Sequence, residues 1–63
     1  MNQESLFIPI GYGSGTVVYD KYKNPYLVGK SIGGSLHLID EISQKEAKTR
    51  IDTGAKVLTS EEN

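Results

Sequence analysis

Residues 36–47, LHLIDEISQKEA, change their periodicity half-way along, and this change decides the fold class. Leu36 and Leu38 share one face of an extended chain, as in a β-strand with one buried side. Ser43 and Glu46 then have the spacing of a capping box, the pair of side chains that closes the first turn of a helix. A strand that leads into a capped helix predicts an α+β fold.

The helix is predicted over residues 44–53. Ile42 and Ala47 stand at the two positions of a hydrophobic staple, and Ile51 follows Ala47 by four residues, so these two share a face. Gly54 suits the left-handed conformation that ends many helices. A helix of about three turns is not stable alone in water, so its apolar face must pack against a sheet.

Strand patterns precede and follow this helix. Pro9 cannot donate a ladder hydrogen bond, so the first strand is expected either at a sheet edge or with a late start. Turn-forming residues between the strands include the hairpin pair Gly33-Gly34 and the segment KYKNP at residues 21–25. The strands are predicted at residues 5–10, 16–20, 26–30, 35–39 and 55–60.

These elements predict a single small domain spanning residues 1–63, with frayed ends at residues 1–4 and 61–63. We expect an antiparallel sheet of about four to five short strands with one helix packed on one face. The other face then carries apolar side chains without cover, so we expect a protein partner, by default a second copy in a homodimer. The candidate partner-binding residues are Phe7, Tyr12, Val18, Tyr22, Tyr26 and Val28, and Ile39 is expected on the same uncovered face.

Composition excludes several kinds of site. The 63 residues contain no cysteine and a single histidine, His37, so the chain forms neither a disulfide nor a zinc site of cysteine and histidine. We expect no metal and no cofactor. The apolar runs are too short for a membrane span, and the N-terminus lacks the basic region of a signal peptide. These features predict a cytoplasmic protein without membrane contact.

The segment IGYGSGTVV, residues 10–18, holds three glycines in five positions. A dinucleotide-binding loop needs a different glycine spacing and a helix after it, whereas a strand is predicted here. We interpret the segment as a flexible connection between two strands, with Tyr12 exposed at its tip. Loops of this kind are common contact sites.

No constellation of acid, base and nucleophile is recognisable in the sequence. His37 is interpreted as a surface residue on the outer side of its strand. Asp40 and Glu41 lie just before the helix, where acids complement its dipole. We therefore expect no enzyme, no catalytic residue and no small-molecule substrate. The basic residues interpreted as a solvated face are Lys45, Lys48, Arg50 and Lys56.

A nucleic-acid partner is the alternative. The net charge of −1 and the lack of a dense stripe of lysine and arginine favour protein contact. Tyrosines interleaved with lysines can nevertheless stack on bases and bind phosphates. In this alternative the DNA-contacting residues are Lys21, Lys23, Tyr26 and Lys30.

Residues 13–52 resemble the arm-type DNA-binding domain at the N-terminus of tyrosine recombinases. The likeness is carried by GSG at residues 13–15 and ISQKEA at residues 42–47. It implies three short strands, one helix and DNA binding, and with the small size it implies an origin in a phage or mobile element. That family reads DNA through sheet positions rich in arginine and lysine, whereas the sheet predicted here offers lysines and no arginine. We therefore expect a small non-catalytic binding or regulatory module that works by protein contact.

Overall fold

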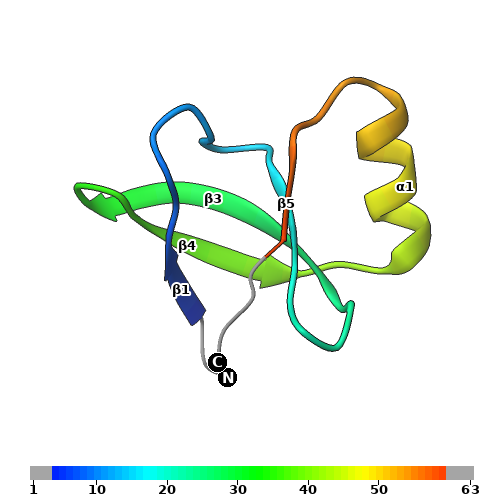
Figure 1. Ribbon diagram of the computed structural model, residues 1–63, viewed down its shortest axis with the longest axis horizontal. Helices are drawn as coiled ribbons and strands as arrows, with labels where there is room; N and C mark the ends of the chain where they lie inside the picture. The colour runs from blue at the N-terminus through cyan, green and yellow to red at the C-terminus, as the bar shows by residue number, and fades with distance from the viewer. Residues whose placement is uncertain (1–3, 60–63) are drawn as a thin grey trace.

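The computed structural model describes residues 4–59 as one helix and a five-stranded sheet (Figure 1). In chain order the elements are β1 (Glu4–Phe7), β2 (Val17–Tyr19), β3 (Pro25–Gly33), β4 (Leu36–Glu41), α1 (Gln44–Asp52) and β5 (Val57–Thr59). The strands lie in the order β1-β4-β3-β2-β5; β2 and β5 are parallel, and the other neighbours are antiparallel. The predicted small α+β fold is confirmed. The sheet is mixed because the chain that follows α1 runs beside β2 in the same direction.

β1 begins and ends earlier than predicted. Glu4 already pairs with Ile39, so it belongs to the strand and is not a frayed end. The strand ends at Phe7, two residues before Pro9, whose missing N–H cannot continue the ladder. The backbone then turns, and the Tyr12 N–H donates to the Pro9 carbonyl (3.1 Å).

The β3–β4 hairpin turns one residue later than predicted. Gly33 is still paired, opposite Leu36, so the two-residue loop is Gly34-Ser35 rather than Gly33-Gly34. Gly34 has a φ of +56°, which glycine adopts without the steric penalty of a side chain.

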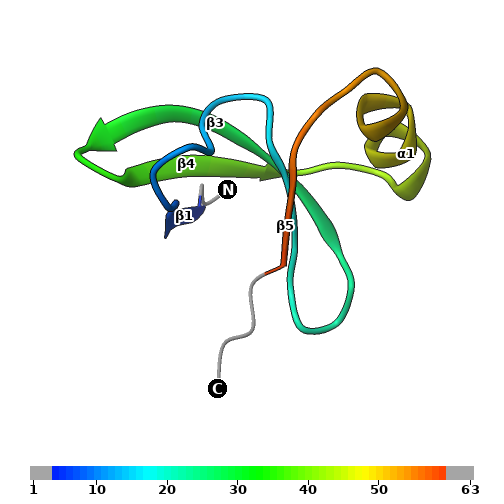
Figure 2. The same cartoon turned by 45° about the horizontal axis from the view of Figure 1, so that its top comes forward.

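Ile8, Val18, Val28 and Ile39 form the core on one face of the sheet. Ile8 comes from the connection between β1 and β2, which crosses the β3–β4 hairpin in both views (Figure 1, Figure 2). The sequence predicts an uncovered face at Val18, Val28 and Ile39, and this is wrong because the connection folds over them. Half-buried side chains around this core are Leu6, Tyr12, Tyr26 and Leu58.

α1 packs against β2 and β3 on the opposite face, which we call the outer face. Adjacent residues of a strand point to opposite faces, so Val17 lies on this side of the sheet while Val18 lies in the core. Val17 and Ala47 are both fully buried. Figure 1 shows α1 near one end of the sheet and β1 at the other. The contacts of this short helix are with β2 and β3, and its packing does not extend over the outer face of β1 and β4.

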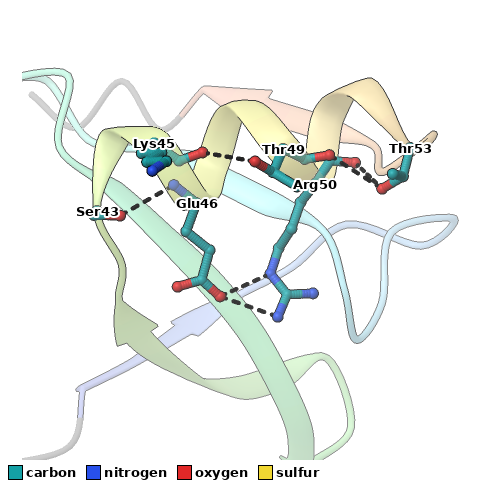
Figure 3. Close-up of polar contacts among 6 residues, drawn as sticks. All are labelled: Ser43, Lys45, Glu46, Thr49, Arg50 and Thr53. Carbon is teal, nitrogen blue, oxygen red and sulfur yellow. Dashed lines mark hydrogen bonds and ion pairs between the residues drawn. The ribbon is translucent and has the colours of Figure 1, made fainter.

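The predicted helix signals at Ser43 and Gly54 are confirmed. Ser43 Oγ accepts a hydrogen bond from the Glu46 N–H (3.0 Å), and Gly54 has a φ of +106°. The second half of the capping box is not formed. Glu46 instead accepts a hydrogen bond from Arg50 Nε (3.1 Å) one turn later (Figure 3).

Within residues 4–59, no helix is long and apolar enough to cross a membrane. The helix α1 has nine residues, whereas a membrane span needs about 20. The frayed ends predicted at residues 1–3 and 61–63, and the last residue of the strand predicted at 55–60, lie outside the described residues.

Ser43→Ala should lower the melting temperature, because the Glu46 N–H loses its acceptor. Losing an N-cap costs about 0.5–2 kcal/mol, and in a domain this small each kcal/mol lowers the melting temperature by about 4–8 °C. Thermal unfolding followed by circular dichroism measures the change. Glu46→Gln is the control, since it removes only an exposed ion pair worth about 0–1 kcal/mol. A melting temperature unchanged by Ser43→Ala would contradict the role of Ser43 as a cap.

Candidate functional site

Three apolar side chains gather on the outer face of β1 and β4. Leu6 packs against the core, so its neighbour Phe7 points to the outer face, where it lies opposite Leu36. Leu38 is the next residue of β4 on that face. Phe7 is 72% exposed, and the two leucines are half-buried. We call Phe7, Leu36 and Leu38 the edge patch.

β1 is an edge strand beside this patch. In the part of the chain that the structure describes, it pairs with β4 and with no other strand. Of the features that commonly keep an edge from pairing with another chain, its four residues hold one charge, Glu4, and neither lysine nor proline. The edge patch therefore combines exposed apolar side chains with backbone groups that can pair with an incoming strand.

Sequence reasoning missed Leu36 and Leu38 as surface residues, although it identified Phe7. The two leucines face outward because His37, between them, lies on the core side opposite Leu6. His37 is half-buried there rather than on the outer surface. The pairing of β1 with β4 shows which face of β4 points away from the core. The alternation of residues within β4 alone does not show this.

Two of the predicted contact residues are inside the protein. Val18 and Val28 are each 1% exposed, so they cannot reach a partner in this fold. Tyr12 is half-buried against the core, and the prediction that it lies exposed at a loop tip is wrong. Ile10 occupies that tip instead and is 100% exposed, because the turn from Pro9 to Tyr12 directs it outward.

Tyr22 is the other predicted contact residue with a well-exposed side chain (72%). It lies in the β2–β3 turn, which Asp20 organises. Asp20 Oδ1 accepts hydrogen bonds from the N–H groups of Tyr22 and Asn24, both at 2.8 Å. The Lys23 N–H donates to the Asp20 carbonyl (2.9 Å), and the Asp20 N–H donates to the Asn24 carbonyl (3.1 Å). The turn is therefore held by backbone and side chain together.

The same contacts set the charge state of Asp20. The hydrogen bond from the Asn24 backbone, the largest contribution, holds the pKa of the Asp20 carboxyl below its ordinary value, with support from Tyr22 and Tyr26. Tyr26 donates its hydroxyl proton to Asp20 Oδ2 (3.2 Å). Burial, followed by this hydrogen bond, raises the pKa of Tyr26, and the carboxylates of Glu4 and Glu41 add to the effect. The sheet around Tyr26 is therefore acidic.

The structure places the four residues of the DNA-binding alternative in the β2–β3 turn and along β3. Lys21 and Lys23 lie in the β2–β3 turn, while Tyr26 is half-buried among carboxylates. Lys30 is four residues further along β3, about 13 Å at the rise of a strand. The tyrosine expected to stack on bases is thus held against Asp20.

The glycine segment borders an open groove of about 510 Å³. Lys56 crosses from the opposite wall: its ammonium donates to the Gly11 carbonyl and lies 5.6 Å from the centre of the Tyr12 ring. Gly11 and Gly15 have φ values of +101° and +94°, so both are needed for the backbone turn. The groove is lined by Gly11, Gly13, Ser14, Gly15, Thr16, Thr53, Gly54, Ala55 and Lys56.

His37 forms a hydrogen bond with the backbone of its own hairpin. His37 Nδ1 lies 2.9 Å from the Ser35 carbonyl, so this nitrogen carries the proton that it donates. Residues 4–59 contain no group of three or more histidine, cysteine, aspartate or glutamate side chains that could hold a metal ion. Comparison with protein-family models, curated proteins and solved structures found no match for the chain. The edge patch and the β2–β3 turn are therefore the candidate sites.

Lys23→Gly should stabilise the protein. Lys23 has a φ of +68°, a conformation that costs a residue with a side chain about 1–2 kcal/mol; the larger entropy that glycine loses on folding offsets about 0.5–1 kcal/mol of this. We expect a net gain of up to about 1 kcal/mol, measured by thermal unfolding. Lys23→Ala is the matched control: it removes the charge but keeps the strained Cβ. A gain of the same size in Lys23→Ala would show that charge, and not strain, is the cause.

Acid should destabilise the protein partly through Asp20. Because its pKa is lowered on folding, the ionised carboxylate stabilises the fold above its unfolded pKa of about 3.9, and this contribution is lost as the pH falls through the folded pKa. Asp20→Asn keeps an oxygen acceptor but does not titrate. Its melting temperature should therefore fall less steeply than that of the wild type between about pH 5 and pH 2. A slope in Asp20→Asn equal to that of the wild type would contradict this role of the Asp20 carboxylate.

Proposed function

We propose that this chain is a non-catalytic binding module that works through protein contact and associates with a second copy of itself across the edge patch. The observation that carries the proposal is Phe7, a large apolar side chain left 72% exposed on an edge strand. A monomer rarely leaves such a side chain beside other apolar groups and an unpaired strand edge without a use.

The proposed contact is antiparallel pairing of β1 with β1 of the second copy. A two-fold axis perpendicular to the sheet keeps the outer face of both copies on the same side. The two edge patches then meet on a continuous sheet, and Phe7 of each copy is covered. The net charge of −1 per chain opposes this approach only weakly.

The energetics favour a weak, reversible dimer. Full burial of a phenylalanine side chain contributes about 1.5–3 kcal/mol, and the half-buried leucines add less. New backbone hydrogen bonds contribute about 0.5–1.5 kcal/mol each. The entropic cost of association, roughly 4–15 kcal/mol, offsets most of these gains. The tightest dissociation constant that these contacts support is therefore in the micromolar range.

Analytical ultracentrifugation over a concentration series tests the proposal. The wild type should shift from monomer to dimer, and Phe7→Ser should remain a monomer at the same concentrations. Ile10→Ser is the matched control: it also replaces an exposed apolar residue, but one in a loop away from the β1–β4 ladder, so it should dimerise like the wild type. A wild-type monomer throughout the micromolar range, or equal weakening by the two variants, would refute the edge patch as the contact.

A further inference from the structure

We infer that the β2–β3 turn, residues 20–24, is a second contact surface, which docks into an acidic pocket of a different protein. This inference is independent of the edge patch. It rests on three properties of the turn: its conformation is held in advance, it bears a strained lysine, and it presents an exposed tyrosine between two cations.

The turn is held from several directions. Asp20 accepts from two backbone N–H groups at 2.8 Å, and its own backbone forms two hydrogen bonds across the turn. The helix adds a tether, because Gln44 Nε2 donates to the Lys23 carbonyl (3.0 Å). A loop already ordered in this way loses little conformational entropy on binding, which favours affinity.

Lys23 has a positive φ, a backbone conformation that only glycines adopt elsewhere in the described part of the chain. Among the described residues, the other positions with positive φ are Gly11, Gly15, Gly34 and Gly54, and Lys23, at +68°, is the exception. A side chain costs free energy in this region of backbone space, so the strain points to a use for the side chain that glycine would lack. Lys23 is exposed, so it offers a positive charge at the tip of a turn whose backbone is held in place.

Tyr22 supplies the apolar part of this surface. Its side chain is 72% exposed, and the Lys21 ammonium lies 5.3 Å from the centre of its ring. Tyrosine is among the residues that contribute most to protein contacts when a pocket desolvates it. A tyrosine between two exposed lysines fits a pocket that accepts an aromatic ring and has carboxylates at its rim.

The surrounding charges favour a protein over a nucleic acid. The tip carries two lysines, so it can neutralise about two phosphates, for a salt slope of only about −1.8. Asp20 lies beneath the tip, and Glu41 and Asp40 lie opposite Tyr26 and Leu27 at the start of β3. A nucleic-acid backbone is longer than the tip of the turn, so its phosphates would come near these carboxylates and be repelled. A protein pocket can enclose Tyr22 and the two lysines without approaching the carboxylates.

The probe for this surface is a displayed library of random peptides, selected on the full chain and, in parallel, on Phe7→Ser. We expect both selections to enrich peptides rich in aspartate and glutamate. Tyr22→Ala and Lys21→Glu should each weaken their binding by about tenfold or more. Lys30→Glu should leave binding unchanged, because it reverses an exposed charge that lies on β3 and outside the turn. If the same peptides are enriched in the selection on Phe7→Ser, they do not bind through the edge patch.

Lys23→Gly separates binding from folding. It is expected to be at least as stable as the wild type, yet it lacks one of the two cations, so it should bind the acidic peptides more weakly. Failure to enrich acidic peptides, or peptides that bind Tyr22→Ala as well as the wild type, would overturn the inference. Binding of duplex DNA that Lys21→Glu abolishes would also overturn it, in favour of a nucleic-acid partner.

Discussion

The packing of Ile8 against Val18, Val28 and Ile39 is the contact on which the rest of the molecule depends. A sheet this small has two faces to cover and one helix to cover them. The chain solves this by ending β1 just before Pro9 and folding the following connection back over the sheet, so that a loop residue completes the core. Because that face is closed by the chain itself, α1 serves the other face only, and the sheet positions that α1 does not reach stay exposed.

The two candidate contact surfaces follow from this arrangement. The edge patch lies on the outer face at β1, beyond the strands against which α1 packs. The β2–β3 turn lies apart from β1 in both views, close to the start of α1, to which Gln44 connects it (Figure 1, Figure 2). The edge patch is apolar and lies on the regular pairing of β1 with β4. The β2–β3 turn is cationic, and the side chain of Asp20 holds its backbone. Their chemistry is different enough that one partner is not expected to compete for both.

Local signals in the sequence predicted most of the local structure. Ser43 and Gly54 mark the ends of the helix through contacts within a few residues. The segment at residues 21–25 marks a turn, although Lys23 takes the left-handed conformation there and Pro25 already begins β3. The edge patch needed more, because the outward direction of Leu36 depends on its pairing with Phe7, far away in sequence. Burial of Val18 likewise depends on Ile8, whose place above the sheet has no pattern in the sequence. Tyr22 could be predicted as a contact residue, but the hydrogen bonds that hold its backbone and the strain at Lys23 depend on how the chain folds around Asp20.

The proposed two-fold dimer through β1 would change what the turn can do. It would carry two copies of the β2–β3 turn, one toward each end of the joined sheet. A partner with two acidic pockets at the matching separation would then bind the second turn as an intramolecular step, at an effective concentration far above that of free protein. Such a partner would also favour the dimer, since linkage requires that a ligand stabilise the state it binds more tightly. A weak dimer is suited to this coupling, because a tight one would be fully formed before any partner could shift it.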